Sequence, residues 1–409
     1  MTTHETGASR GDAGLDGFDA MVAEELRDPY PEFARLRDRS PVVRQESTIE
    51  GAPPAYAVYR HADVTRVLRD GGTFSSAVIA QGMAEVWGPK IIVGMDAPEH
   101  HRHRALVSVA FRQTTLARWE DSLVRRVVDD LIDQFIERGH ANLVSEFTFA
   151  FPAKVIAGVL GLPESDYRRF QQWAVRIINI SGDWATAVRC SQELREYLTS
   201  IVDERRQDPR DDLVTDLVTA ELDGEKLDDD EIYSFLRMLL PAGIETTYRS
   251  TGNLLYLLLT HPDQLDAVRA DRSLIPQAIE EGLRYESPVL VTPRVTTTNT
   301  SLSGIEIPAG AIVMSMLGSA NRDPDAYDNP ETFDIFRDAK QHMSFGTGPH
   351  LCLGMHLARM ESRIALNALL DRLPGLRLDP DEATRLDAHI DGNLLLRSPT
   401  SLPVVWEHV

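Results

Sequence analysis

The chain has 409 residues, of which 43% are hydrophobic and 26% charged, and its formal net charge at pH 7 is −21. These proportions are ordinary for a globular protein with a sizeable core. The strongly negative charge argues against nucleic acid or an anionic membrane as the main partner. No run of about twenty apolar residues is present, so we expect no membrane anchor and a cytoplasmic protein.

The two ends of the sequence differ in character. Residues 1–17 are polar, acidic and rich in Gly and Thr, which predicts a disordered leader and excludes a secretory signal. From Asp28 onward there is no internal repeat, low-complexity stretch or credible linker. We therefore expect one domain over residues 18–409.

Helical patterns dominate the first half. A short strand is expected over Pro54–Tyr59 because its aromatic and β-branched residues are typical of strands. Apolar spacing then predicts a helix over Leu116–Glu137, ending at Gly139. Two further helices are expected over Glu164–Ile178 and Trp184–Arg206.

A long helix is expected from Asp228 to Thr260, with an acidic start and a stop at His261-Pro262. It is apolar around most of its circumference, which is typical of a helix buried at the centre of a large domain. Pro241 interrupts it and should kink it, because proline removes one hydrogen bond of the helix. The alternative is that the chain turns between two helices at this point.

Alternating residues from Arg294 to Met316 predict a hairpin-rich sheet. Together these elements indicate a mainly α fold with a small β part.

The chain has only two cysteines, Cys190 and Cys352. Neither has a Cys-x-x-Cys partner, so disulfides and structural zinc are not expected. Cys190 lies in a helical stretch without a motif, and we interpret it as incidental. Cys352 lies in a glycine-rich loop just before a helix, where free backbone N–H groups favour a thiolate. The alternatives are a buried structural cysteine and a nucleophile, for which His350 is not placed as a base.

The stretch Phe345-Gly-Thr-Gly-Pro-His-Leu-Cys-Leu-Gly354 resembles the haem-binding loop of the cytochrome P450 family. Two other family motifs are found in the expected order. Ala242-Gly-Ile-Glu-Thr-Thr247 is similar to the family's oxygen-handling helix motif, and Glu281-x-x-Arg284 is similar to its E-x-x-R motif. The resemblance covers nearly the whole chain and implies the fold of the soluble bacterial members, with haem between the long central helix and the cysteine-loop helix.

The resemblance implies a role for each motif residue. Cys352 would bind the iron of haem b (iron protoporphyrin IX). Thr246 would face bound oxygen, and Glu245 would feed protons towards it. Glu281 and Arg284 would form a structural pair. The residues implied to hold the cofactor are His100, Arg104, Ala242, Arg294, Phe345, Gly346, His350, Gly354 and Ala358.

The substrate side of the family's fold corresponds here to largely apolar segments. An apolar pocket fits a terpenoid, steroid, fatty acyl or aromatic substrate. The residues expected to line it are Val78, Ile79, Met83, Val86, Trp87, Ile91, Ile177, Leu239, Val289, Leu290 and Leu394.

The implied reaction inserts one oxygen atom from dioxygen into this substrate, with electrons from a separate ferredoxin and ferredoxin reductase. A local cluster of arginines is a candidate docking face for an acidic ferredoxin. Its members are Arg102, Arg104, Arg112, Arg118, Arg125 and Arg126. The alternatives are a peroxide-driven variant, a haem protein that senses or carries a gas, and a protein without haem.

Overall fold

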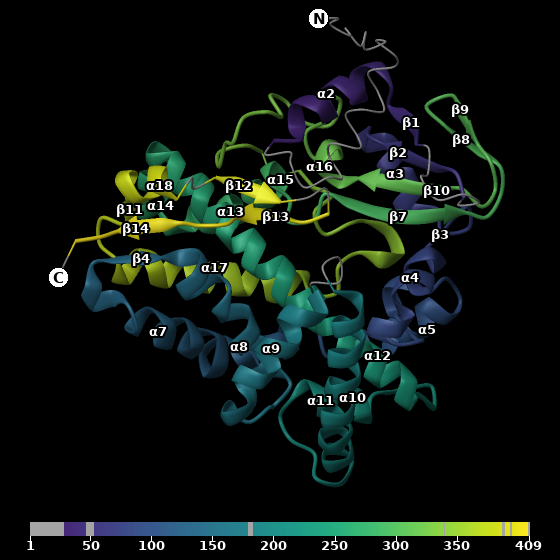
Figure 1. The fold of residues 1–409 in the computed structure, drawn as a ribbon, viewed down its shortest axis with the longest axis horizontal. Coiled ribbons are helices and arrows are strands. Elements are labelled where there is room, and N and C mark those ends of the chain that lie inside the picture. The colour runs from purple at the N-terminus through teal and green to yellow at the C-terminus, as the bar shows by residue number, and fades with distance from the viewer. Residues whose placement is uncertain are drawn as a thin grey trace, which may run out of the picture.

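The computed structural model describes residues 28–45, 53–178, 183–338, 340–386, 389–392 and 395–407. The expected leader and Leu394 lie outside these ranges. Within them the predicted fold class is confirmed, because helices dominate and the strands form small sheets (Figure 1). No helix in the described part of the chain combines the length and apolar character needed to cross a lipid bilayer.

The α-helices, together with shorter helical turns, account for most of the described residues. They are α2 (Tyr30–Arg39), α3 (His61–Arg69), α4 (Ala77–Trp87), α5 (Glu99–Ser108), α6 (Gln113–Leu116), α7 (Arg126–Asp133), α8 (Ala150–Val159), α9 (Tyr167–Ile178), α10 (Trp184–Gln207), α11 (Leu213–Thr219), α12 (Asp229–Leu240), α13 (Thr246–Thr260), α14 (Pro262–Ala270), α15 (Ile275–Tyr285), α16 (Leu317–Ala320), α17 (Met355–Arg372) and α18 (Pro380–Arg385).

Short helical turns of other kinds connect them. The wide π turns are η2 (Glu120–Arg125), η4 (Val144–Thr148) and η6 (Pro241–Glu245). The tight 3₁₀ turns are η1 (Ile92–Gly94), η3 (Ile136–Arg138), η5 (Glu164–Asp166), η7 (Arg272–Leu274) and η8 (Gly348–His350).

The largest sheet has five strands in the order β1 (Val42–Gln45), β2 (Ala55–Val58), β10 (Ile312–Met316), β7 (Val291–Thr296) and β3 (Phe74–Ser75). It lies at the upper right of Figure 1, beside α2 and α3. All its neighbouring strands are antiparallel except β2 and β10. The strand expected over Pro54–Tyr59 is therefore confirmed as β2.

The remaining strands pair in small groups. A three-stranded sheet has the order β11 (Arg377–Leu378), β14 (Pro403–Val405) and β4 (His140–Asn142), and the hairpins are β5 (Glu221–Leu222) with β6 (Glu225–Lys226), β8 (Thr300–Leu302) with β9 (Ile305–Ile307), and β12 (Ile390–Gly392) with β13 (Arg397–Pro399). The hairpin-rich sheet expected over residues 294–316 is confirmed, although β7 begins earlier, at Val291.

The helix expected over Leu116–Glu137 is not continuous. The chain forms the π turn η2, then α7, which ends at Asp133, and then the 3₁₀ turn η3. Gly139 ends the segment as expected, in the left-handed region at φ 71°. The apolar residues Leu123, Val127 and Val128 have spacings that also suit an α-helix, so the sequence pattern does not reveal the π turn.

Helix α12, turn η6 and helix α13 together form the long helix expected at the centre, and we call them the central rod. Asp228 caps its start with two reciprocal hydrogen bonds. The Glu231 N–H donates to Asp228 Oδ1 at 2.8 Å, and the Asp228 N–H donates to Glu231 Oε2 at 2.9 Å. Pro241 keeps helical angles of φ −62° and ψ −39°. The chain therefore does not turn at Pro241, and the helix widens into η6 instead.

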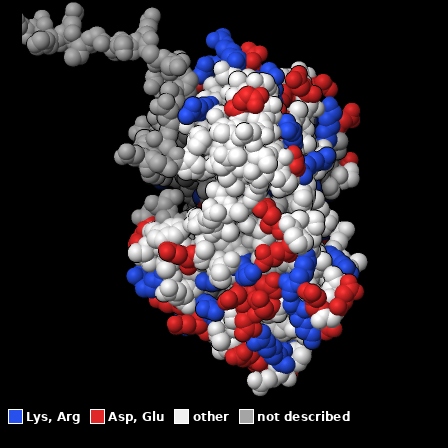
Figure 2. Space-filling model, turned by 90° about the vertical axis from the view of Figure 1, so that its right-hand side faces the viewer, with Lys and Arg blue, Asp and Glu red and all other residues white. Residues whose placement is uncertain are grey.

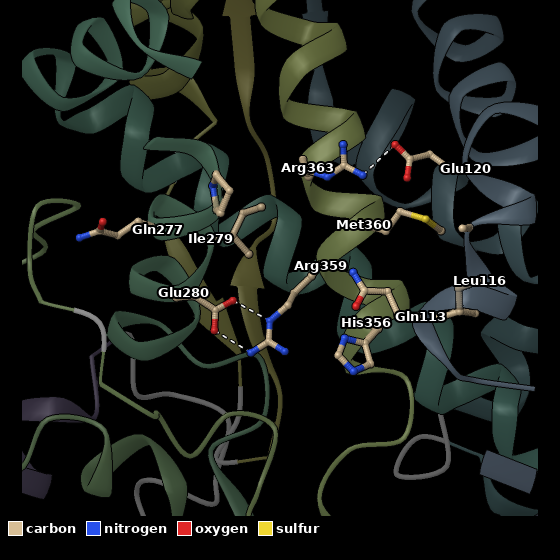
Figure 3. A pocket seen from close by; sticks show the side chains of 12 residues that line it. Gln113, Leu116, Glu120, Gln277, Ile279, Glu280, His356, Arg359, Met360 and Arg363 are labelled. Carbon is tan, nitrogen blue, oxygen red and sulfur yellow. Dashed lines mark hydrogen bonds and ion pairs between the residues drawn. The ribbon is translucent and has the colours of Figure 1, made fainter. Parts of the chain in front are cut away.

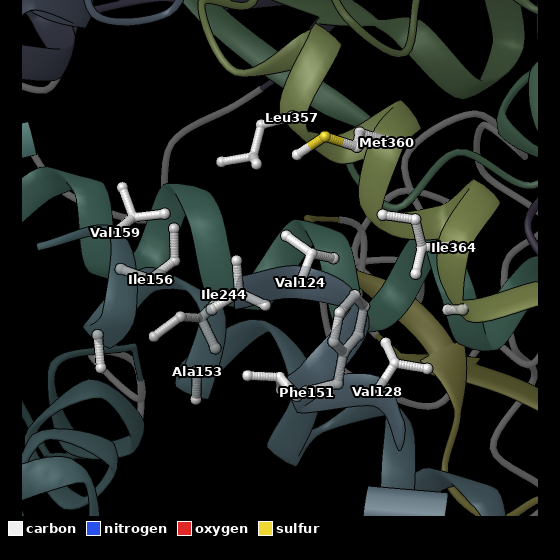
Figure 4. Close-up of a cluster of buried hydrophobic side chains, with 14 of the residues drawn as sticks. Val124, Val128, Phe151, Ala153, Ile156, Val159, Ile244, Leu357, Met360 and Ile364 are labelled. Carbon is white, nitrogen blue, oxygen red and sulfur yellow. The ribbon is translucent and has the colours of Figure 1, made fainter. Parts of the chain in front are cut away.

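An apolar cluster packs the central rod against its neighbours (Figure 4). It joins side chains from five elements: Val124 of η2, Val128 of α7, Phe151, Ala153, Ile156 and Val159 of α8, Ile244 of η6, and Leu357, Met360 and Ile364 of α17. Burying each larger side chain contributes about 1.5–3 kcal/mol. Gly243 allows the close approach, since a Cβ there would lie 2.7 Å from Ile156 Cδ1.

Charged side chains of both signs are interspersed on the lower part of the face shown in Figure 2. Ion pairs between helices are also found in the described structure, for example Arg195 with Asp230 at 3.5 Å and Arg206 with Asp229. The net charge of −21 is therefore not gathered into one acidic field on this face.

Candidate active site

A central cavity of about 330 Å³ lies between the central rod and the loop that contains Cys352. Residues of α12, η6 and α13 line one side, and residues 344–358 line the other. The lining is mostly apolar, with phenylalanines such as Phe111 and Phe235 among it. Such a cavity suits a largely apolar ligand.

The loop from Phe345 to Gly354 holds Cys352 against the cavity. Gly346 and Gly348 have φ values of 68° and 75°, which glycine adopts without strain. Gly348 is also required sterically, because a Cβ there would lie 2.6 Å from the Leu68 carbonyl oxygen. The Cys352 N–H donates to the Phe345 carbonyl at 2.8 Å and closes the turn.

The surroundings of the Cys352 sulfur fit a metal-bound thiolate. Burial raises the pKa of this thiol, while the backbone N–H groups of Gly354 and Met355 and the charges of Arg104 and Arg359 act to lower it. Donors and cations thus converge on the sulfur, yet burial still disfavours the free thiolate. A cation bound directly to the sulfur completes such a site.

Part of the cavity lining carries positive charge. Arg104 and Arg294 lie there, and neither forms an ion pair with a described residue, although the charge of Asp96 acts on Arg294. Burial lowers the pKa of Arg294 to about 10. The rings of His100 and His350 lie 4.0 Å apart, and His100 Nε2 has no hydrogen-bond partner among the described residues. This edge therefore fits an anionic group such as the propionates of haem.

The remaining residues expected at the cofactor also lie around the cavity. Ala242, Phe345, Gly346, Gly354 and Ala358 all line it. A Cβ on Gly354 would meet no protein atom within 4 Å, so this glycine leaves space for a ligand and not for another part of the chain. The structure thus brings all nine predicted cofactor residues to one cavity.

The two residues expected to handle protons face different directions. Thr246 lines the cavity, and its Oγ1 donates to the Ala242 carbonyl at 2.6 Å. Glu245 is buried but does not line the cavity. Its Oε1 accepts from Arg249 Nε at 2.7 Å and from Arg249 Nη2 at 2.5 Å. Arg249 in turn donates to Ser398 Oγ of β13 at 3.1 Å.

The sequence analysis missed Glu361 of α17, which lines the cavity and is 1% exposed. Burial raises the pKa of its carboxyl to about 8, an effect that Thr247 partly offsets. Its Oε1 has no hydrogen-bond partner in the described structure. A signal was available, because a carboxylate within the apolar pattern of this helix has the same desolvation cost that singles out Glu245.

The expected substrate residues separate into three groups. Ile79, Leu239 and Val289 line the cavity. Val78, Met83, Val86, Trp87, Ile91, Ile177 and Leu290 do not, and Leu394 lies outside the described residues. Residues 77–87 form helix α4, which directs Val86 into the core; Ile177 and Leu290 are equally buried there. Other apolar residues line the cavity in their place, among them Ile92, Val93 and Met238.

Glu281 and Arg284 form a buried pair on α15. Arg284 Nε and Nη2 donate to the two carboxylate oxygens at 2.7 and 2.8 Å. Arg337 lies 3.3 Å from the same carboxylate, and the Asp334 N–H donates to it at 2.9 Å. The pair therefore joins α15 to the segment around residues 333–337.

A second hollow, of about 610 Å³, lies beside α17 and is lined by residues of α6, η2 and α15 as well (Figure 3). We call it the α17 hollow. Its two arginines are paired within the chain: Arg359 with Glu280 through two bonds of 2.7 Å, and Arg363 with Glu120 at 2.8 Å. Arg359 also lies over the ring of Phe345, at 4.7 Å, and so links this hollow to the cysteine loop.

Comparison with known proteins identifies this architecture. The cytochrome P450 family matches residues 50–401. The cytochrome P450 monooxygenase PikC of Streptomyces venezuelae is 36% identical over 405 residues, which cover 95% of this chain and 93% of PikC. The structure of cytochrome P450 CYP109Q5 from Chondromyces apiculatus has a TM-score of 0.86 and 37% identity, covering 95% of this chain and 98% of that chain.

CYP109E1 from Bacillus megaterium, solved in complex with testosterone, has a TM-score of 0.84 and 30% identity, covering 93% of this chain and 99% of that chain. The chain therefore belongs to the cytochrome P450 family, as the motifs predict. It is a monooxygenase that uses dioxygen, acts on a small molecule and carries a haem-thiolate iron cofactor.

Proposed function

We propose that Cys352 is the thiolate ligand of haem b in the central cavity, and that the enzyme hydroxylates an apolar small molecule with electrons from a ferredoxin. The observation that carries the proposal is the cavity itself. It joins a cysteine surrounded by donors, an edge with two arginines that form no ion pair within the described chain, and an apolar lining. When bound, the haem-thiolate iron supplies the oxygen activation that no side chain provides.

The chain's own residues bind and orient the cofactor in this proposal. Arg104, Arg294, His100 and His350 hold the propionates, because these groups lie together at the positive edge. Gly346, Gly354, Phe345, Ala242 and Ala358 form its close walls.

Proton supply is assigned to the central rod. Thr246 holds a hydroxyl at the cavity, and its bond to the Ala242 carbonyl fixes that hydroxyl within the wide turn η6. Glu245 is the adjacent carboxyl group that refills it with protons. Because the lining is apolar, protons reach the cavity through such groups and not through bulk water.

The substrate is proposed to be a terpenoid, steroid, fatty acyl or aromatic compound. Support comes from the apolar lining of the cavity, including Ile79, Leu239 and Val289, and from the testosterone complex of the similar CYP109E1. A cytoplasmic location is part of the proposal, and the two free cysteines support it.

A ferredoxin is proposed to dock over the α17 hollow, which abuts the cysteine loop through Arg359 and Phe345. The predicted arginine cluster contributes less than its sequence suggests. Arg102, Arg118, Arg125 and Arg126 form ion pairs within the chain, and Arg104 faces the cavity. Arg112 remains exposed next to α6, where it adds positive charge near the hollow.

The carbon monoxide difference spectrum of the reduced enzyme tests the central claim. We expect the strongly red-shifted Soret band of thiolate-bound haem in the wild type and in Cys190→Ala, and its loss in Cys352→Ala. Product formed with ferredoxin and dioxygen supports the monooxygenase. Product formed only with peroxide supports the peroxide-driven alternative, and a haem protein without any product supports gas sensing. An absent haem spectrum contradicts the proposal.

A further inference from the structure

Arg237 of α12 is a buried cation without a counter-ion in the described part of the chain. The residue is 6% exposed, and no described carboxylate forms an ion pair with it. The charge of Asp230 acts on it, but Asp230 pairs with Arg195 instead, at 3.5 Å. Burial lowers the pKa of Arg237 to about 10. An unpaired charge in a protein interior is costly, so this side chain calls for a partner from outside the chain.

The guanidinium of Arg237 is held only by long bonds. Its Nε donates to the Tyr233 carbonyl at 3.3 Å, and its Nη1 donates to Ser191 Oγ of α10 at 3.4 Å. Its Nη2 has no hydrogen-bond partner among the described residues and lies against Gly88, where a Cβ would clash with it. Good bonds between nitrogen and oxygen span about 2.7–3.2 Å. Most of the donor capacity of this side chain is therefore unused.

A second buried donor without an acceptor belongs to the segment that covers Arg237. Trp87, directly before Gly88, has a buried Nε1 with no hydrogen-bond partner in the described structure. Ser234 Oγ, which also lies against Gly88, already accepts from the Lys90 N–H at 3.1 Å. The seam where α4, α10 and α12 pack on one another (Figure 1) thus holds more donors and positive charge than its described acceptors satisfy.

This seam borders the central cavity. Arg237 does not line the cavity, but the next residue of the helix, Met238, does. The loop that passes over the guanidinium at Gly88 reaches the cavity lining at Val93. At the rise of a helix, Arg237 lies roughly 13 Å before Thr246 along the central rod. A ligand held by Arg237 would therefore place its far end, and not its polar end, near that threonine.

We propose that Arg237 recognises the carboxylate of an apolar acid, and that the substrate of this enzyme is such an acid, oxidised far from its carboxylate. The proposal rests on the apolar substrate cavity proposed above and narrows its substrate class. It favours fatty acids and terpenoid acids over neutral steroids and other neutral compounds. Arg237 is thereby assigned as a residue that determines specificity.

The chemistry of the guanidinium selects a carboxylate. Arginine presents a planar fork of donors that matches the two oxygens of a carboxylate, and such charge-assisted bonds are roughly twice as strong as bonds between neutral groups. The present bonds of Arg237 are long and go to neutral oxygens, so little is lost when the guanidinium turns from them towards a ligand in the cavity. A bound anion also offsets the cost of the unpaired charge. An ester of the same chain gains neither effect.

The test measures the binding of dodecanoic acid and of its neutral counterpart, methyl dodecanoate, to the intact haem-loaded enzyme. A ligand that enters the cavity displaces the water on the iron, and the resulting shift of the Soret band gives a Kd without turnover. The variants are Arg237→Met, Arg237→Lys and the control Arg206→Met. Arg206 is a suitable control because it lies on the neighbouring helix α10 and pairs with Asp229 at the surface.

We expect the wild type and Arg206→Met to bind the acid at least about tenfold more tightly than the ester, near the lower end of what a hydrogen bond to a charged group contributes. Arg237→Met should bind both ligands equally, and Arg237→Lys should keep part of the preference because it keeps the charge. A wild type without this preference, or a preference that survives in Arg237→Met, overturns the proposal while the apolar cavity stands. If the acid, the ester and testosterone all leave the Soret band unshifted, the proposed substrate cavity fails as well.

Thermal unfolding separates recognition from a structural role. Because Arg237→Met removes an unpaired buried charge, it should unfold at the wild-type temperature or above it. Arg205→Met should unfold at a lower temperature, because Arg205 is equally buried but pairs with Asp212 at 2.5 Å. A lowered unfolding temperature in Arg237→Met, with equal loss of affinity for the acid and the ester, overturns the proposal in favour of a structural role.

The position of oxidation is the last readout. With NADPH, a plant-type ferredoxin and its reductase, the wild type should hydroxylate dodecanoic acid in the half of the chain farther from the carboxylate, because roughly 13 Å of helix separate Arg237 from Thr246. Arg237→Met should lose this restriction. Oxidation beside the carboxylate in the wild type overturns the proposal.

Discussion

Replacing Arg284 by methionine tests whether the Glu281–Arg284 pair braces the cysteine loop. Besides its two bonds to Glu281, Arg284 donates to the backbone carbonyls of Asn321 at 3.0 Å, Pro330 at 2.9 Å and Thr332 at 3.0 Å. Methionine keeps most of the length and apolar volume and removes all five donations. The substitution therefore removes the polar contacts with little loss of packing.

The cost is estimated from the groups that lose a partner. Removing one member of a buried ion pair costs about 3–5 kcal/mol, and each buried carbonyl left without a donor adds about 1–3 kcal/mol. Arg337 and the Asp334 N–H remain at the Glu281 carboxylate and offset part of this loss. We expect Arg284→Met to lower the free energy of unfolding by at least about 3 kcal/mol, the lower end of the ion-pair cost alone.

We expect the loss of Arg284 to loosen the cysteine loop, and so the bound cofactor, before the helices unfold. Asn321 accepts from the Met343 N–H at 2.6 Å and donates to Ser344 Oγ at 2.9 Å, directly before Phe345. In guanidinium chloride titrations of the haem-loaded enzyme, we expect the Soret band of Arg284→Met to be lost at lower denaturant than the far-ultraviolet ellipticity.

The matched control for this titration is Arg272→Met. Arg272 pairs with Asp371 at 3.1 Å on the surface, where such pairs contribute about 0–1 kcal/mol. The double variant Glu281→Gln/Arg284→Met should be less destabilised than the sum of the two single variants, because no carboxylate is left unpaired. If Arg284→Met costs no more than Arg272→Met, the bracing role is refuted.

Two further predictions concern the cavity. Burial raises the pKa of Glu361 from 4.5 to about 8, so the folded protein binds more protons than the unfolded chain between these pH values. The free energy of unfolding should therefore fall as pH rises through this window, by at most about 1.4 kcal/mol per pH unit. Glu361→Gln should remove this slope in denaturation midpoints measured from pH 5 to 8, and an unchanged slope contradicts the assignment. Gly354→Ala should lower the haem content per protein. Gly71→Ala should not lower it, because Gly71 also has open space at Cβ but does not line the cavity. Equal haem content in the two variants contradicts a close ligand at Gly354.

The order of elements and the convergence of the motif residues on one cavity were predictable because they depend on local patterns and on long motifs. Capping at Asp228, the end at Gly139 and the strand β2 follow from residue chemistry within a few positions. The wide turn η6 was not predictable in the same way. Proline explains a disturbed helix, but whether the chain kinks, turns or widens depends on what packs around it, such as Ile156 against Gly243.

The substrate lining was the least predictable part of the site. Apolar residues of α4 and its surroundings are equally compatible with core and pocket, since both are apolar and only what packs around each side chain separates them. Val86 and Ile79 lie seven residues apart and so share one face of α4, yet Val86 is buried in the core whereas Ile79 lines the cavity. A resemblance identifies the segment near the substrate, and the packing of the segment decides which residues face it.

The carboxyl groups of Glu245 and Glu361 lie in different environments, which suit them to different tasks. Glu361 is buried at the cavity without a cation, so its raised pKa lets it keep a proton near neutral pH. Only the bond from Thr247 stabilises the anion that donation would leave, and it does not outweigh burial. Glu245 has Arg249 to stabilise its anion and a solvent-connected hollow beside that arginine. A group that delivers protons repeatedly must be stable in both forms and must be refilled from water. Glu245 meets both requirements, whereas Glu361 is suited to act as a fixed hydrogen-bond donor to the cavity.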